Sequence, residues 1–486
     1  MASPYETPRP EIVDGVHRLS PTGISILIVG GGIGGMMMAL ESWRQGHSVR
    51  ILERSPNFDS IGDCLGILPP AWSTLRFFPE MKAQFERESY DVEFSFWRYE
   101  GRLIDHRGEA EWNQPGCVHV ARNVRVPWIE TRSSIAGMLA KQCERLGLTI
   151  EYGNTVTEYD EDEEMAIVTV MRSDGTTSRE LADIVVAADG VATTSHGHVT
   201  GSKAKAESCG YALYRGLIPM DLLRSKLSPD IQKKFFSSAR GDFRIYMAPS
   251  PDIHANIIIT KDFVCYVVTY KETTSGRESW KATVSADAVL NKLEETPGWD
   301  PDVIEILKHI PEKSCIDWTL RWRDPQPQWA SDGGRVVQLG DSAHSFLPTS
   351  GNGATQAIED AISLASCLRI GGKGKEYIST KVHNKLRFER VSALQKGGFA
   401  NRQLMHHIDL DAAEAKPELI TMSLPGWIWK QNPAKYAMDN YAAVEAHLTT
   451  GSPFENTNGP PGVKYEAWTI AGEMEKEALS LQHGIS

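Results

Sequence analysis

The sequence predicts an α/β protein with two lobes, a parallel-sheet lobe split along the chain and a β-sheet lobe inserted between its halves. Residues 25–29 are a short apolar run that ends in glycines; a helical pattern follows, and residues 48–52 are a second buried strand. Several strand-like runs occupy about 205–320, and residues 336–339 then return to a buried apolar strand. Beyond about residue 376 the sequence pattern predicts helices, so we expect C-terminal helices to complete the fold.

The composition excludes several classes of protein. The 486 residues carry a formal net charge of −12 without a basic field, so we expect no nucleic-acid partner. No uncharged apolar run reaches about 18 residues, so we expect no membrane span. Seven scattered cysteines, none in a CxxC spacing, favour reduced thiols in a cytoplasmic protein. We also expect no metal site, because His406 and His407 are adjacent on a helix and cannot share a face.

The first glycine-rich segment has the form G-x-G-x-x-G at Gly30, Gly32 and Gly35. After a strand, such glycines allow a tight turn, a close approach of backbone to pyrophosphate, and close helix–strand packing. Glu53 stands at the end of the second strand, where the fingerprint needs a carboxylate for a ribose. The motif predicts one Rossmann-like dinucleotide site but does not distinguish NAD from FAD. The candidate ligands in this region are Gly30, Gly32, Gly34, Gly35, Glu53 and Arg54.

A second segment, residues 340–353, follows the buried strand at 336–339 and leads into a helix. It opens with Gly340-Asp341 and closes with Gly351-Asn352-Gly353. A carboxylate at a strand end can bind a polyol chain. Glycines beside a helix N-terminus can hold the electron-rich edge of an anionic ring through N–H groups and the helix dipole. This chemistry favours a flavin.

With these segments the chain resembles the class A, single-component FAD-dependent monooxygenases, the para-hydroxybenzoate hydroxylase and salicylate hydroxylase family, in its fungal natural-product type. The resemblance covers about residues 24–400 and implies the para-hydroxybenzoate hydroxylase fold with bound FAD. It implies that Asp341 binds the ribityl chain, that Pro348 borders the oxygen-reacting side of the isoalloxazine, and that residues 351–353 line its pyrimidine end. The candidate FAD ligands that it implies are Gly66, Arg132, Asp189, Asp341, Gly351, Asn352, Gly353 and Ala354.

One motif departs from the family pattern. Family chains carry a D-G-x-x-S-x-x-R stretch that serves both FAD and NAD(P)H. Here Asp189 and Gly190 are intact, but Thr193 takes the serine position and His196 the arginine position. Arginine is a fixed, forked cation, whereas histidine is mostly neutral at pH 7. The choice between NADPH and NADH therefore stays open.

We divide the chain into an FAD-binding domain (24–90, 118–204 and 326–400), a substrate domain (91–117 and 205–325), and a C-terminal helical segment and tail (401–486). The resemblance implies that the enzyme uses NADPH or NADH and O₂ to hydroxylate or epoxidise an aromatic or polycyclic small molecule. It implies a C4a-hydroperoxyflavin as the oxygen donor and a place in natural-product biosynthesis.

The substrate domain offers three candidate catalytic side chains. Arg215 lies on a predicted strand and could orient a phenolate, carboxylate or carbonyl by charge-assisted hydrogen bonds. Tyr246 and Tyr266 are candidates for pocket walls or proton donors, because related enzymes floor the pocket with strands in this region. The full set of candidate catalytic residues is Arg215, Tyr246, Tyr266 and Pro348.

Three alternative functions stay open. A flavin oxidase or reductase without oxygen transfer is favoured by His196. A halogenase of similar fold would need tryptophans where Tyr214 and Gly216 stand. A non-enzymatic relative that kept the fold for protein binding is disfavoured by the intact segment 351–353.

Overall fold

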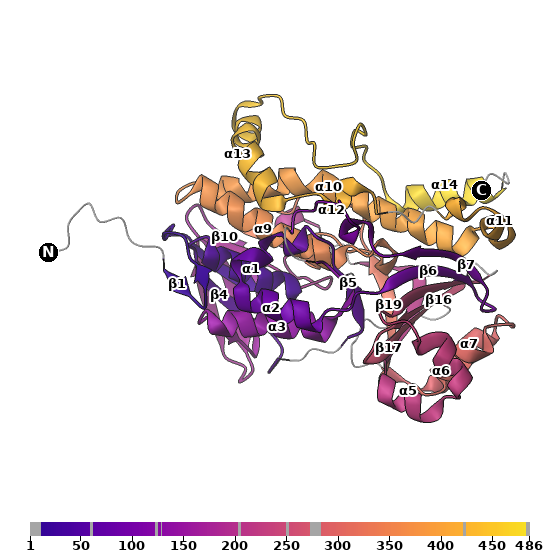
Figure 1. Ribbon diagram of the computed structural model, residues 1–486. Helices are drawn as coiled ribbons and strands as arrows, with labels where there is room; N and C mark the ends of the chain where they lie inside the picture. The colour runs from indigo at the N-terminus through magenta and orange to yellow at the C-terminus, as the bar shows by residue number, and fades with distance from the viewer. Residues whose placement is uncertain are drawn as a thin grey trace.

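The computed structural model describes residues 11–58, 62–121, 125–127, 129–202, 206–248, 252–272, 283–420 and 424–482. Two large sheets lie side by side, and a long helix runs along both of them (Figure 1). The predicted α/β fold with an inserted β-sheet lobe and C-terminal helices is confirmed.

The first sheet has five strands, and every neighbouring pair in it is parallel. Its order is β20 (Val336–Gln338), β13 (Ile184–Ala187), β3 (Ser25–Val29), β4 (Ser48–Leu52) and β9 (Ile150–Glu151). One face packs against α1 (Ile33–Arg44), α3 (Arg132–Arg145) and α9 (Gly353–Gly371). The other face packs against an antiparallel sheet of β10 (Asn154–Glu161), β11 (Ala166–Arg172) and β12 (Thr177–Ala182).

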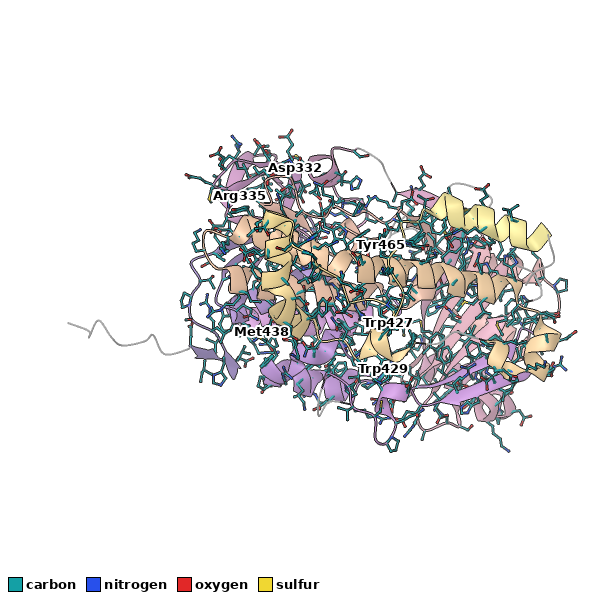
Figure 2. All side chains as sticks on the ribbon, turned by 90° about the horizontal axis from the view of Figure 1, so that it is seen from above. Asp332, Arg335, Trp427, Trp429, Met438 and Tyr465 are labelled. Carbon is teal, nitrogen blue, oxygen red and sulfur yellow. The ribbon has the colours of Figure 1, made fainter. Side chains whose placement is uncertain are left out.

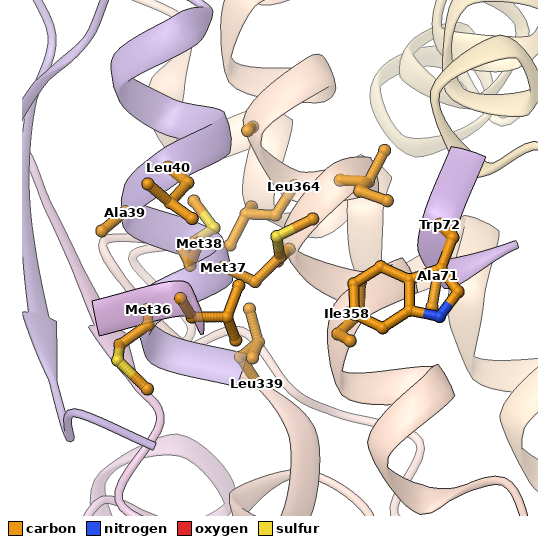
Figure 3. Close-up of a cluster of buried hydrophobic side chains, with 14 of the residues drawn as sticks. Met36, Met37, Met38, Ala39, Leu40, Ala71, Trp72, Leu339, Ile358 and Leu364 are labelled. Carbon is orange, nitrogen blue, oxygen red and sulfur yellow. The ribbon is translucent and has the colours of Figure 1, made fainter. Parts of the chain in front are cut away.

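Apolar residues that are fully buried join α1 to α9. Met36, Met37 and Met38 of α1 meet Ile358 and Leu364 of α9 in one cluster (Figure 3). Unbranched methionine side chains fill irregular gaps of this kind. The cluster fixes the two helices side by side, and this brings their N-terminal ends to the same region of the molecule.

The second sheet has eight strands and lies on the right in Figure 1. Its order is β18 (Thr283–Val284), β19 (Cys315–Trp322), β14 (Glu207–Pro219), β17 (Phe263–Lys271), β16 (Ile253–Ile259), β15 (Asp242–Met247), β6 (Glu93–Arg98) and β7 (Leu103–Gly108). Its pairs are antiparallel except β15 with β6. The helices α5 (Met220–Lys226), α6 (Pro229–Phe236), α7 (Ala286–Glu294) and α8 (Pro301–Leu307) cover one face.

The long helix α10 (Glu376–His407) contacts α9 with its first half and β16 with its C-terminal end. Short C-terminal elements dock on it: Figure 2 shows Trp427 and Trp429 on α12 beside it, and Tyr465 further along the tail. The indole N–H of Trp468 donates to the Ser392 hydroxyl (2.9 Å). In the parts of the chain described above, no helix is long and apolar enough to cross a membrane.

The remaining elements are short or lie at the margins of the two sheets. They are β1 (Ile12–Val13), β2 (Val16–His17), β5 (Cys64–Gly66), η1 (Ala71–Phe77), α2 (Pro79–Glu88), η2 (Glu111–Asn113), β8 (Ile129–Thr131), α4 (His196–Thr200), η3 (Gly340–Ser342), η4 (Pro348–Ser350), α11 (Leu410–Ala415), η5 (Pro417–Leu419), α12 (Gly426–Trp429), α13 (Pro433–Thr450) and α14 (Ile470–Gln482). The domain boundaries drawn from the sequence stay a prediction.

Candidate active site

A cavity of about 670 Å³ opens between the two sheets. Its wall on the side of the parallel sheet includes Gly32 at the start of α1 and residues 348–354 before and within α9. Its opposite wall is the eight-stranded sheet, which contributes Arg215 and several apolar side chains. The glycine turn and the aspartate-led loop, more than 300 residues apart in the chain, thus face one space.

Two glycines of the first turn are required by the backbone around them. Gly30 has φ +109°, and a Cβ there would lie 2.3 Å from the carbonyl oxygen of Ala188. A Cβ on Gly35 would lie 2.0 Å from the carbonyl oxygen of Gly30. A Cβ on Gly34 would press on Leu339, whereas one on Gly32 would meet nothing within 4 Å. The turn therefore has no room for a side chain at Gly30, Gly34 or Gly35, whereas Gly32 faces open space in the cavity.

The carboxylate of Glu53 caps this turn from the end of β4. Its Oε2 accepts a hydrogen bond from the backbone N–H of Gly31 (2.7 Å), and its Oε1 accepts one from Ser55 (2.8 Å). Arg54 is exposed at the surface next to it. Neither Glu53 nor Arg54 is among the described residues that line the cavity, so their predicted cofactor contacts stay a proposal.

Asp341 lines the cavity where β20 ends. Enclosure by the protein raises the pKa of this carboxyl above its ordinary value, although the charges of His344, Arg132 and Arg323 work against the rise. Arg132, the first residue of α3, lines the same part of the cavity. Its backbone N–H donates to the carbonyl oxygen of Asp63 (2.9 Å), and burial lowers the pKa of its guanidinium.

A buried ionic network holds the Asp341 loop from behind. Asp360 of α9 accepts hydrogen bonds from the His344 ring (2.6 Å), the Gly340 N–H (3.3 Å) and Arg387 of α10 (2.8 Å). Arg387 also binds Glu359 (2.5 Å), as does Arg390 (2.9 Å). Burial alone would raise the pKa of Glu359, but Arg390 and Arg387 lower it below its ordinary value. Charges of opposite sign are therefore matched within the network.

Residues 348–354 form a turn that ends at the N-terminus of α9. Pro348 starts η4 and lines the cavity, and Gly351 has φ +59°. The Asn352 amide N–H donates to the Ser350 carbonyl (2.7 Å), while its amide oxygen is buried with no partner in the described part of the chain. Backbone N–H groups in the first turn of a helix have no intrahelical acceptor, so those of Gly353 and Ala354 are available at the cavity wall.

The opposite wall carries the Arg215 cation, which is mostly buried. The Arg215 guanidinium on β14 forms an ion pair with Asp63, which is 2% exposed. Burial lowers the pKa of Arg215 to about 10, which still leaves it protonated at neutral pH. Asp63 directly precedes β5, and Gly66 at the end of β5 lines the cavity as well. The pair therefore links the loop around β5 to the eight-stranded sheet.

The prediction that Tyr246 and Tyr266 line the pocket is wrong. Their strand neighbours Ile245 and Val267 line the cavity, and successive side chains of a strand point to opposite faces. Both tyrosines are fully buried on the other face, among side chains of the helices α5 to α8, and Tyr246 stacks on Trp97. They belong to the packing core of this lobe.

Asp189 and His196 are not among the described residues that line the cavity, although Ala188 and Gly190, the chain neighbours of Asp189, do line it. Asp189 accepts a hydrogen bond from the Tyr159 hydroxyl (2.9 Å), and burial raises the pKa of its carboxyl. His196 begins α4, where burial, with a smaller contribution from the charge of Arg323, lowers the pKa of its imidazole. A neutral imidazole thus stands where the family pattern has an arginine.

Sequence reasoning missed several residues of the sheet wall. Asn256 of β16 and Phe243 of β15 line the cavity, and so does Trp318 of β19. Period-2 alternation relative to Arg215 could have flagged them, but only once the pairing of the strands was known.

Known proteins share this arrangement. Residues 105–378 match the FAD binding domain family. The FAD-dependent monooxygenase fsr3 of Gibberella fujikuroi is 38% identical over 465 residues, which cover 95% of this chain and 88% of fsr3. The crystal structure of FqzB has a TM-score of 0.79 and 26% identity, and covers 93% of this chain and 100% of FqzB. The crystal structure of CtdE in complex with FAD and substrate 4 has a TM-score of 0.77 and 26% identity, and covers 88% of this chain and 100% of CtdE.

A cavity bounded by a dinucleotide turn and an aspartate-led loop defines a flavoprotein, and the residues present fit FAD. Gly32 leaves room for a phosphate, the first turn of α9 offers N–H groups, and Asp341 faces the space between them. The chain belongs to the FAD-dependent monooxygenases, and the resemblance drawn from the sequence is confirmed.

Proposed function

We propose that this monooxygenase uses NADPH or NADH and O₂ to hydroxylate or epoxidise an aromatic or polycyclic small molecule in natural-product biosynthesis. The observation that carries the proposal is the cavity in which the FAD-side loops face a largely apolar sheet wall that includes the Arg215 cation. The similar protein CtdE was crystallised in complex with both FAD and a substrate, which supports one shared space for the two.

In this proposal, different groups of FAD-side residues bind different parts of the cofactor. Gly32 and the N-terminus of α1 hold the pyrophosphate, and Asp341 with Arg132 holds the ribityl region. Residues 351–353 and Ala354 hold the pyrimidine edge through backbone N–H groups. When bound and reduced, FAD supplies the activation of O₂ and the transfer of one oxygen atom.

The substrate-side residues bind and orient. Apolar side chains of the sheet, among them Phe243, Ile258 and Val267, bind rings and exclude water from the reacting atoms. Arg215 holds an electron-rich oxygen of the substrate by a charge-assisted hydrogen bond. Pro348, at the start of η4, borders the space where substrate and O₂ meet.

Three measurements on the purified protein test this function. The protein should show the two-banded visible spectrum of oxidised flavin at one FAD per chain. With a substrate, it should oxidise NADPH or NADH, consume O₂ and add one oxygen atom to the product. Oxidation of NAD(P)H with all O₂ recovered as hydrogen peroxide, for every aromatic substrate tried, would instead identify the oxidase or reductase that His196 favours.

The role of Asp341 has its own test. Asp341→Ala should purify largely colourless with an unchanged circular dichroism spectrum, because the carboxylate proposed to hold the ribityl region is gone. The control is Asp332→Ala, which removes an exposed carboxylate that contacts Gln328 (3.0 Å) and should leave the protein yellow. A fully FAD-loaded Asp341→Ala variant would refute the assignment.

A further inference from the structure

One cross-strand row of the eight-stranded sheet carries polar side chains into the wall of the cavity. In the strand register, Ile245 pairs with Asn256, Asn256 with Val267, and Val267 with Arg215. All four side chains line the cavity. The row thus carries two polar groups with one apolar side chain between them. The row next to it pairs Phe243 with Ile258 and is apolar where it lines the cavity.

Asn256 has hydrogen-bonding capacity that the described part of the chain does not use. Its amide oxygen is buried and accepts no hydrogen bond from any described residue. A buried polar atom without a partner costs about 1–3 kcal/mol, so a ligand that satisfies it gains a comparable amount. The terminal amide can also turn to present either its oxygen or its NH₂ group. Asn256 can therefore bind either a hydroxyl or a carbonyl.

Arg215 stands at the other end of the row and lines the cavity. Its guanidinium forms an ion pair with Asp63, and a guanidinium can form charge-assisted hydrogen bonds with a ligand oxygen. Neighbouring strands lie about 4.8 Å apart, so the backbones of Arg215 and Asn256, two strands apart, are separated by about 10 Å. A flat molecule that reaches both groups must pass over Val267.

We propose that Asn256 is a specificity-determining residue that, together with Arg215, selects fused-ring aromatic substrates with an oxygen substituent at each end. The proposal rests on the proposed function and names the substrate class of the same cavity. Arg215 binds the more acidic oxygen, the rings lie on Val267 and the apolar row beside it, and Asn256 binds the oxygen at the far end. A substrate with one oxygen leaves the Asn256 amide buried and unpaired, and binding is weaker for that reason.

Isothermal titration calorimetry on the FAD-loaded protein tests the proposal with two probes, 2,6-dihydroxynaphthalene and 2-naphthol. The wild-type protein should bind the diol at least ten-fold more tightly than the mono-ol. Asn256→Leu, which is similar in size but apolar, should reduce that ratio to about one, while Asn256→Ser, which keeps a hydroxyl, should retain part of the preference. Ile258→Val on the same strand is the matched control, and should weaken both probes equally.

The outcomes separate this inference from the proposed function. An unchanged diol preference in Asn256→Leu, or equal binding of both probes by the wild-type protein, would overturn the role of Asn256. Failure of the wild-type protein to bind the diol would overturn the substrate class. A lack of NAD(P)H-dependent oxygen transfer, with the Asn256-dependent binding preference intact, would overturn the proposed function and leave the selectivity of the cavity supported.

Discussion

Replacing Arg387 by methionine tests whether the buried ionic network supports the whole FAD side of the cavity. Arg387 is 1% exposed and binds both Glu359 and Asp360, which are 0% exposed. Methionine keeps much of the volume but removes the charge, so Glu359 would keep Arg390, while Asp360 would keep the His344 ring and the Gly340 N–H. Removing one partner of a buried ion pair costs about 3–5 kcal/mol, because it leaves a charge buried without compensation.

That cost can be converted into a melting temperature. At about 2.1 cal/mol/K of unfolding entropy per residue, the 486 residues give about 1 kcal/mol/K, so the Tm should fall by about 3–5 °C. Differential scanning calorimetry at pH 7 measures this fall. FAD release on dilution should also become faster, because Asp360 positions His344 and Gly340 beside Asp341.

Two further variants make the test specific. Arg387→Met combined with Asp360→Asn restores the charge balance and should recover at least half of the lost Tm. Lys385→Met on the same helix removes a surface ion pair with Glu389 (3.3 Å), a type of contact worth at most about 1 kcal/mol, and should leave the Tm unchanged. A Tm for Arg387→Met within 1 °C of the wild-type value would refute the reasoning.

Three other predictions concern single side chains. Burial raises the pKa of Glu130 to about 8, so the folded protein keeps a proton that the unfolded chain releases above its ordinary pKa of 4.5; stability therefore falls as the pH rises from about 4.5 to 8. Glu130→Gln should remove that fall, seen as a Tm gain over wild type that is larger at pH 9 than at pH 5; an equal gain at both values would contradict it. Gly35→Ala should yield insoluble or FAD-free protein, because its Cβ would strike the Gly30 carbonyl, and a yellow, stable variant would argue against this packing. Tyr246→Phe should leave kcat and KM unchanged in steady-state assays, because Tyr246 lies on the far face of the sheet; a large loss of kcat would return it to the site.

The sequence predicted best where local pattern and chemistry coincide. Local residue spacing predicted two segments: the strand, glycine turn and helix at 25–44, and the loop at 340–353. In each segment the residues that form the pattern lie close together in the chain. The inserted sheet was predicted as a lobe, but the direction of its side chains was not. Both faces of β15 are buried at Ile245 and Tyr246. The alternation of apolar and polar residues that normally shows which face of a strand is buried is therefore missing, and the sequence does not show which side chain faces the cavity.

Long-range pairing was also beyond the sequence. Asp63 lies in the loop before β5 and Arg215 lies on β14, about 150 residues later in the chain. Neither local segment has a pattern that predicts the other as its partner. Glu53 was predicted to bind a ribose, and the structure shows its carboxylate on the Gly31 and Ser55 N–H groups. Such contacts depend on how the loops close, which residue spacing does not determine.

The continuity of α10 has a consequence for how this protein can vary in length. A helix of 32 residues spans about 48 Å, and one extra residue turns everything beyond it by about 100°. An insertion between Arg387 and His406 would leave Arg387 on its carboxylates but turn His406 away from His254, with which it shares a hydrogen bond (2.9 Å). Insertions and deletions should therefore be tolerated before or after this helix but not in its interior, between Arg387 and His406.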